Sequence, residues 1–142
     1  QAGHKIYVAT NQAGLARQKF YLPDLEAMHA KLLRLVGAAG GQIEKIFFCP
    51  HHPNAECECR KPRPGLLNQI RRFHPGAIDT LTFVGDSVKD IDAAIAGDAD
   101  PVLVLTGNGK ATLQVIQQRG LMIEVHSDLA AFAKARISAF PC

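Results

Sequence analysis

The sequence lacks the features that mark membrane, secreted and nucleic-acid-binding proteins. No apolar run approaches the roughly 18 residues that a membrane-spanning helix needs, and no charged-then-apolar leader with a cleavage site opens the chain. Its 16 basic and 13 acidic residues leave a formal net charge of +3, which is too balanced to predict nucleic-acid binding. We therefore expect a cytoplasmic protein that has neither a membrane nor a nucleic acid as its partner.

The length and the apolar pattern favour one α/β domain. A chain of 142 residues, 47% of them hydrophobic, can bury one core, and it lacks repeats, low-complexity segments and domain linkers. We therefore expect a single domain over residues 1–142. Short apolar runs without polar alternation are separated by helical periodicity, which is typical of a parallel sheet covered by helices. The predicted strands are residues 6–10, 43–48, 81–84 and 101–106, and the predicted helices include residues 23–36, 66–73, 91–96, 113–116 and 129–137.

Polar residues follow three of the four predicted strands, where ligands bind in open parallel sheets. Thr10 to Gly14 follows the first strand, and its hydroxyl, amide and backbone N–H groups could hold an anion. The same five residues could instead form a plain turn that caps a helix. Both interpretations stay open at this point.

An acidic residue stands at the end of the third predicted strand. Ser87 and Asp90 have the spacing of a helix capping box, which is a structural role. Asp86 precedes that box, so its carboxylate is expected to face the ligand crevice and to bind a hard cation such as Mg²⁺. After the fourth strand, Thr106 to Lys110 lacks the spacing of a phosphate-binding loop and is expected to be a glycine-rich turn.

A cluster of cysteine and histidine follows the second predicted strand in the pattern C-x-H-x5-C-x-C. The four predicted ligands are Cys49, His51, Cys57 and Cys59. Four soft or borderline ligands with no open position indicate a closed, structural Zn²⁺ site. His52 could replace His51, and the alternative to any metal is a solvated loop with three reduced thiols. The remaining cysteine, Cys142, is far away in sequence, so the four make a poor disulfide framework.

Two basic residues follow the last of these ligands directly. Arg60 and Lys61 would be held by a metal-folded loop, and Pro62 and Pro64 stiffen the chain after them. A guanidinium beside an ammonium suits an oxyanion such as phosphate. The alternative is a solvated basic pair of the kind common on protein surfaces.

These motifs, in this order, resemble a known phosphatase family. Thr10, Lys61 and Gly85-Asp86 with Asp90 are similar to the second, third and fourth motifs of haloacid dehalogenase superfamily phosphatases. The stretches "TNQAGLAR", "CPHHP", "CECRKPRPGLL" and "VGDSVKD" resemble the D-glycero-D-manno-heptose 1,7-bisphosphate phosphatase family within it. The resemblance implies a three-layer, Rossmann-like fold. It also implies a cytoplasmic, monomeric enzyme that removes the C7 phosphate of this phosphorylated sugar in lipopolysaccharide core heptose biosynthesis.

The resemblance also implies a role for each matching residue. Thr10 and Lys61 would hold the phosphoryl group, Asp86 would ligate Mg²⁺, and Asp90 would support the Mg²⁺ site. The residues that would contact the sugar or its second phosphate are Asn11, Arg17 and Arg60. The implied cofactors are Mg²⁺ and Zn²⁺.

One family motif has no counterpart in the sequence. The first motif, D-x-D, supplies the aspartate nucleophile and a general acid/base, and no D-x-D precedes Ile6. One such pattern, Asp90-Ile91-Asp92, falls in a predicted helix after the fourth motif. The resemblance therefore implies an N-terminally truncated chain that lacks the central first strand and is inactive alone.

Two other functions compete with this one. The first is a histidinol-phosphate phosphatase, which has the same zinc-ligand spacing, although Arg17 and Pro64-Gly65 lean toward the heptose family. The second is a zinc-dependent nucleic-acid or protein-binding module. Its candidate contact residues are Arg60, Arg63, Arg71 and Arg72. Zinc ribbons usually carry two C-x2-C knuckles, and this sequence has one compact loop inside an α/β pattern.

Overall fold

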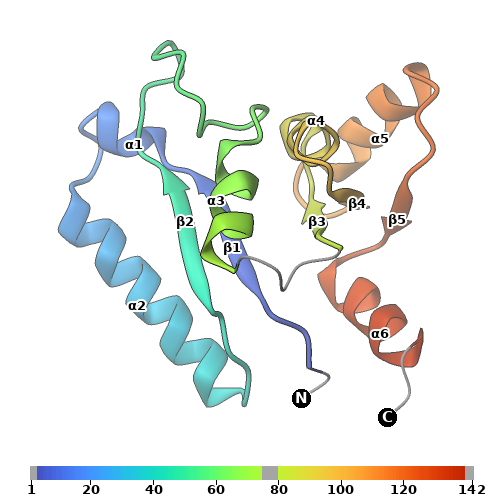
Figure 1. Cartoon of the computed structure of the whole chain (residues 1–142), viewed down its shortest axis with the longest axis horizontal. Coiled ribbons are helices and arrows are strands. Elements are labelled where there is room, and N and C mark those ends of the chain that lie inside the picture. Colours follow the sequence, from blue (N-terminus) through green and yellow to red (C-terminus); the bar gives the residue numbers. More distant parts are fainter. Residues whose placement is uncertain (1–2, 75–79, 140–142) are drawn as a thin grey trace. The chain divides into compact units, whose positions relative to one another are not determined.

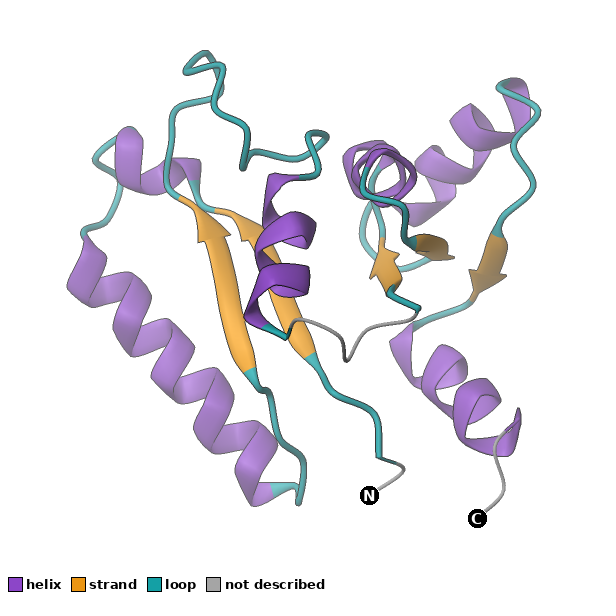
Figure 2. Ribbon diagram, in the orientation of Figure 1, coloured by secondary structure: helices purple, strands orange, loops and turns teal. Residues whose placement is uncertain are grey.

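The computed structural model describes residues 3–74 and 80–139 (Figures 1 and 2). The chain divides into two compact units, one ending at Arg60 and one beginning at Lys61, and each is described on its own. The single domain over residues 1–142 stays a prediction, and Cys142 lies outside the described residues. Within the described ranges, none of the helices combines the length and apolar character that crossing a bilayer requires.

The first unit is a β-α-β arrangement with two parallel strands. Its elements are β1 (Tyr7–Asn11), α1 (Ala13–Ala16), α2 (Leu22–Ala38) and β2 (Lys45–Cys49). Tyr7 lies opposite Lys45 and Asn11 lies opposite Cys49, so both strands end at the same edge of the pair. The backbone N–H of Gln12 donates to the Cys49 carbonyl at 2.8 Å, which ties the two strand ends together.

Helix α2 connects the two strands and runs alongside them (Figure 1). It begins where the Tyr21 N–H donates to the Asp24 carboxylate at 2.8 Å, which satisfies a backbone donor that the helix leaves unpaired. Leu25 is buried, and the His29 ring meets the Phe48 ring of β2 edge-on at 5.6 Å. Leu25 and His29 lie one helical turn apart, whereas the other periodic apolar residues Met28, Leu32 and Leu33 are exposed.

The second unit is a three-stranded parallel sheet with helices. Its elements are α3 (Gly65–Phe73), β3 (Thr82–Gly85), α4 (Val88–Ala96), β4 (Asp100–Val104), α5 (Gly109–Gln118), β5 (Glu124–His126) and α6 (Leu129–Ala139). The strand order is β3-β4-β5, and α4 contacts both β3 and β4. Ile91, Leu103 and Ile116 form a core where α4, β4 and α5 meet.

The α/β prediction with parallel strands is confirmed, and each predicted strand is found within about two residues of its expected position. The strands are divided between two sheets in the described part of the chain, where β1 pairs with β2 and β3 pairs with β4.

Two elements were not predicted. Strand β5 has three residues with polar side chains at both ends, so it offers no apolar run. It forms because it pairs with β4 and because the Glu124 carboxylate binds both His126 (2.7 Å) and Arg136 of α6 (2.9 Å). Helix α1 is a single turn and is too short to show periodicity.

Candidate functional site

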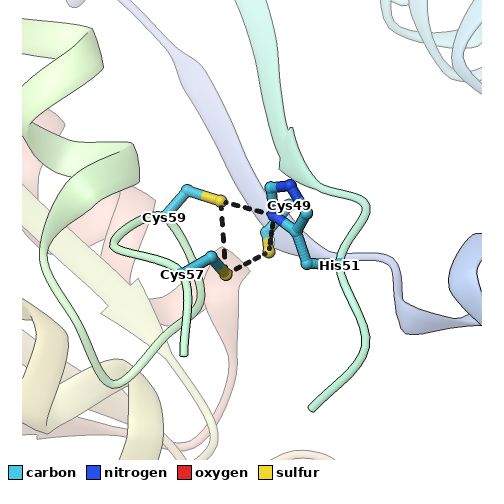
Figure 3. A group of neighbouring side chains, drawn as sticks. All are labelled: Cys49, His51, Cys57 and Cys59. Atoms are coloured by element: carbon cyan, nitrogen blue, oxygen red, sulfur yellow. Dashed lines mark hydrogen bonds between the residues drawn. The ribbon is translucent and has the colours of Figure 1, made fainter. Parts of the chain in front are cut away.

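The four predicted zinc ligands lie together at the end of β2 and in the loop after that strand (Figure 3). Cys49 Sγ lies 3.5 Å from both His51 Nδ1 and Cys57 Sγ. Cys59 Sγ lies 3.2 Å from His51 Nδ1 and 3.7 Å from Cys57 Sγ. All four ligand atoms fall within 4.8 Å of one another. Loop residues up to ten positions apart in sequence therefore converge on one point.

This spacing fits tetrahedral zinc. Zn–S bonds of about 2.3 Å and Zn–N bonds of about 2.0–2.1 Å give tetrahedron edges of roughly 3.5–3.8 Å. Burial and the neighbouring thiols raise the pKa of Cys59 to about 12. Burial opposes ionisation of Cys57 as well, but hydrogen bonds from Cys49, Cys59 and the backbone outweigh it and lower the pKa of that thiol. Three thiolates this close would repel one another, so a cation is needed to hold all three ionised.

His52 has a different role from His51. Its Nδ1 accepts a hydrogen bond from the Asn54 N–H at 3.3 Å, and its carbonyl accepts one from the Ala55 N–H at 3.0 Å. The structure therefore brings His51 to the three sulfurs and uses His52 to hold the next turn of the loop.

A buried ion pair joins the start of the second unit to helix α4. Lys61 Nζ donates to Asp90 Oδ1 at 2.6 Å, and the two side chains are 14% and 9% exposed. Asp90 Oδ2 accepts from the Ser87 hydroxyl at 2.7 Å and from the Ser87 N–H at 3.1 Å. The Asp90 N–H in turn donates to Ser87 Oγ, so the predicted capping box is present. Gly85 is required here, because a Cβ at this position would overlap the Asp90 side chain.

The ionised form of Asp90 is the stable one in this setting. Burial alone would raise the pKa of Asp90, but the Lys61 ammonium and the Ser87 hydrogen bonds outweigh burial and lower it below the ordinary value of 3.8. Asp90 therefore serves the helix start and also fixes the position of the Lys61 ammonium.

The ion pair should make the free energy of unfolding depend on pH in the acid range. Because folding lowers the pKa of Asp90, its contribution is complete above the unfolded pKa near 3.8 and is lost as the pH falls through the lower folded value. At pH 7, Asp90→Asn should lower the free energy of unfolding by about 3 kcal/mol, since it takes the carboxylate charge away from the buried Lys61 ammonium. Thermal melts followed by circular dichroism should show a drop of about 10 °C at pH 7.

The difference between Asp90→Asn and the unchanged chain should shrink below about pH 4. Asp92→Asn is the matched control, because its partner Arg119 lies 2.7 Å away but the Arg119 and Asp92 side chains are 44% and 34% exposed. Such a pair contributes less than about 1 kcal/mol. Equal melting temperatures for the two variants at pH 7 would contradict the role assigned to Lys61 and Asp90.

Asp86 directly follows β3 and accepts two hydrogen bonds from the segment after β4. Its carboxylate accepts a hydrogen bond from the Asn108 N–H at 2.8 Å, and its carbonyl accepts one from the Thr112 hydroxyl at 2.9 Å. The predicted glycine-rich turn is found at residues 106–108, Gly109 and Lys110 belong to α5, and the turn holds Asp86 as well as connecting β4 to α5. Sequence reasoning missed Asn108 and Thr112, although adjacent parallel strands end at the same sheet edge, which was an available signal.

The remaining predicted phosphate and sugar contacts lie in the first unit. Thr10 belongs to β1, and its hydroxyl accepts a hydrogen bond from the Gln12 side chain at 3.1 Å. Asn11 is the last residue of β1, and Arg17 is exposed after α1. Helix α1 begins at Ala13, and Gln12 before it makes no side-chain hydrogen bond that caps the helix.

One guanidinium nitrogen of Arg60 is buried without a hydrogen bond. Its Nη1 is buried and has no hydrogen-bond partner among the described residues. A buried guanidinium N–H without a partner is costly, so an anionic ligand would satisfy it. By contrast, Arg71 donates to the backbone carbonyls of Gly97 (3.1 Å) and Asp98, where it caps the C-terminus of α4. Because Arg71 is occupied by these carbonyls, it is not available as one of the four candidate nucleic-acid contacts.

The chain is similar to several known phosphatases. A family model described as "HAD-hyrolase-like" matches residues 58–129. The chain is 48% identical to the D-glycero-beta-D-manno-heptose-1,7-bisphosphate 7-phosphatase of Pseudomonas aeruginosa over 135 residues, covering 95% of the chain and 75% of that protein. It is 46% identical to the enzyme of the same name from Neisseria meningitidis serogroup A, covering 91% of the chain and 67% of that protein.

Two solved structures are also similar. One is D,D-heptose 1,7-bisphosphate phosphatase from B. bronchiseptica complexed with magnesium and phosphate, with a TM-score of 0.88, 40% identity, and coverage of 96% of this chain and 75% of that one. The other is the phosphatase of the same name from Burkholderia thailandensis, with a TM-score of 0.70, 39% identity, and coverage of 96% and 77%.

Proposed function

Because the chain belongs to the D-glycero-D-manno-heptose 1,7-bisphosphate 7-phosphatase family of haloacid dehalogenase-like hydrolases, we propose that its function is removal of the C7 phosphate of that sugar. The observation that carries the proposal is the 48% identity to a phosphatase of that name along 95% of the chain. The reaction would take place in the cytoplasm as a step of lipopolysaccharide core heptose synthesis.

The buried ion pair supplies the phosphate-binding charge in this proposal. The Lys61 ammonium, fixed by Asp90, would neutralise the phosphoryl oxygens, and the Thr10 hydroxyl would donate a hydrogen bond to them. Asp86 would ligate Mg²⁺, which stabilises the negative charge of the phosphoryl group when it is bound. The solved relative from B. bronchiseptica is complexed with magnesium and phosphate, which supports these two ligands for the chain.

The cysteine and histidine cluster would hold a structural Zn²⁺. The cluster offers three sulfurs and one imidazole nitrogen at tetrahedral spacing, so a bound zinc would have no open position for substrate. Its role would be to hold the loop that ends in Arg60. The unpaired Nη1 of Arg60 would then bind the second phosphate, with Asn11 and Arg17 as further sugar contacts.

The substrate assignment predicts a binding preference. In isothermal titration with Mg²⁺ present, the chain should bind D,D-heptose 1,7-bisphosphate at least about tenfold more tightly than histidinol phosphate, which has one phosphate. Arg60→Met should remove one charge-assisted hydrogen bond to the second phosphate, worth about 1.5–3 kcal/mol, and weaken bisphosphate binding roughly tenfold to hundredfold.

Two controls distinguish loss of the Arg60 contact with the second phosphate from a general loss of positive charge. Arg63→Met makes the same charge change on an exposed residue and should weaken binding of the bisphosphate by less than about threefold. Heptose 7-phosphate, which lacks the second phosphate, should bind equally to the Arg60 variant and to the unchanged chain. Tighter binding of histidinol phosphate would instead favour the histidinol-phosphate phosphatase alternative.

A further inference from the structure

We propose that Asn108 and Gly107 position Asp86 so that it offers a divalent cation one carboxylate oxygen, Oδ1. This inference rests on the proposed function, in which Asp86 ligates Mg²⁺. Asn108 and Gly107 would touch neither the cation nor the substrate, so they are positioning residues for the metal ligand.

The two oxygens of the Asp86 carboxylate have different surroundings. Oδ2 accepts a hydrogen bond from the Asn108 N–H at 2.8 Å and a longer one from the Asn108 side-chain amide at 3.4 Å. Oδ1 accepts no hydrogen bond within residues 3–74 and 80–139. One oxygen is therefore occupied by the protein, and the other is available to a ligand.

The backbone of Asp86 is fixed as well. Its carbonyl accepts the Thr112 hydroxyl at 2.9 Å, and Thr112 is buried in α5. The carboxylate and the carbonyl are thus held by two residues of one segment, four positions apart. A side chain held at both ends loses little conformational freedom when it binds a metal.

Asn108 uses its side chain in an unusual way. It is the N-cap residue of α5, and an asparagine at an N-cap normally accepts a hydrogen bond from the first turn of its helix. Here it makes no such bond, and its amide donates to Asp86 instead. The donor is therefore directed at Asp86 and not at the stability of its own helix.

Gly107 makes the approach of this turn possible. Its φ is +55°, in the left-handed region that glycine adopts without strain. A Cβ at position 107 would overlap Asp86 Oδ2. Any larger residue would therefore push away the oxygen that Asn108 holds.

This arrangement has a consequence for cation binding. Mg²⁺ demands near-ideal octahedral geometry and keeps several of its waters, so it favours a carboxylate that binds through one oxygen. Residues that hydrogen-bond a metal-binding carboxylate contribute about tenfold to hundredfold to metal affinity. Asn108 and Gly107 should contribute on that scale.

The hydrogen bond itself can be tested without any metal. Amide hydrogen exchange measured by NMR should show slow exchange of the Asn108 N–H. Asp86→Ala removes the acceptor, so that exchange should become at least about tenfold faster. The Leu105 N–H, which donates to the His126 carbonyl at 2.9 Å, is the internal control and should not change. Unchanged exchange at Asn108 in the variant would overturn the inference.

The effect on metal binding can be measured with Mn²⁺ as the probe, by electron paramagnetic resonance of the free ion. Asp86→Asn should abolish the binding that the unchanged chain shows. Gly107→Ala should weaken it about tenfold or more. Asn108→Ala removes only the longer side-chain contact and keeps the backbone N–H donor, so it should weaken binding about threefold. Lys110→Ala, an exposed change at the start of α5, is the matched control and should leave it unchanged.

The outcomes separate this inference from the function on which it rests. If Asp86→Asn leaves Mn²⁺ binding unchanged, the assignment of Asp86 as a metal ligand is wrong and the inference falls with it. If Asp86→Asn abolishes binding but both turn variants behave like Lys110→Ala, only the positioning role is overturned. Because Gly107→Ala forces a strained backbone, Asn108→Ala keeps the test valid if the glycine variant does not fold.

Discussion

Replacing Cys57 with serine should release the zinc that we expect the purified chain to hold, at about one ion per chain. Structural zinc sites contribute roughly 10–16 kcal/mol at neutral pH, so one ligand of four accounts for about 2.5–4 kcal/mol. Loss of the Cys57 sulfur should therefore weaken zinc binding on the order of a hundredfold to a thousandfold. Metal analysis after gel filtration measures the content, and competition with a chelator measures the affinity.

The two adjacent histidines provide the matched pair for this prediction. His51→Ala removes the nitrogen that lies 3.2 Å from Cys59 Sγ and should release zinc as Cys57→Ser does. His52→Ala removes only the acceptor for the Asn54 N–H and should keep the metal. The reverse result would assign the ligand to His52. A metal-free chain with three freely reactive thiols would contradict the zinc site altogether.

Loss of zinc should also disturb the basic residue at the end of the loop. Cys59 immediately precedes Arg60, and the loop has few apolar residues that could hold its shape without a metal. Cys57→Ser should therefore bind the bisphosphate more weakly than the unchanged chain does. The loss of affinity in Arg60→Met shows how much of this effect comes from the guanidinium alone.

The strand and helix pattern was predictable where local periodicity is strong. The parallel strands β1 and β2 overlap apolar runs at residues 6–9 and 46–49, and α2 has apolar residues at helical spacing. Strand β5 was not predictable, because its pairing with β4 and the contacts of Glu124 stabilise it more than its own composition does. Its existence depends on partners distant in sequence.

The candidate site shows the same difference between local patterns, which the sequence reveals, and contacts between distant residues, which it does not. The metal cluster was readable from sequence because its four ligands lie within eleven residues. The contact between Lys61 and Asp90 spans 29 positions, and only resemblance to a family pointed to both. The contact between Asp86 and Asn108 spans 22 positions and no motif carries it, so only the folded chain brings that turn to the carboxylate.

A polypeptide limited to these 142 residues should bind phosphate esters but should hardly turn them over. The family mechanism needs an aspartate nucleophile, and none of the described strands ends in D-x-D. One D-x-D pattern lies in α4, where Asp90 binds Lys61 and Ser87, and Asp92 binds Arg119. The other, Asp98-Ala99-Asp100, leads into the start of β4 and does not follow the end of a strand. We propose that neither pattern supplies the nucleophile.

The expected deficit is large because the nucleophile takes part in every chemical step. Removing a nucleophile typically costs a factor of about 10⁴ to 10⁶ in kcat, while binding and charge stabilisation leave a small residual rate. Release of inorganic phosphate from the bisphosphate at saturating Mg²⁺ should therefore be at least about 10⁴-fold slower than for the P. aeruginosa relative assayed beside it. Asp92→Asn should leave this residual rate unchanged. Turnover that matches the relative and disappears in Asp92→Asn would identify Asp92 as the nucleophile, and α4 would then have to release it from Arg119 during the reaction.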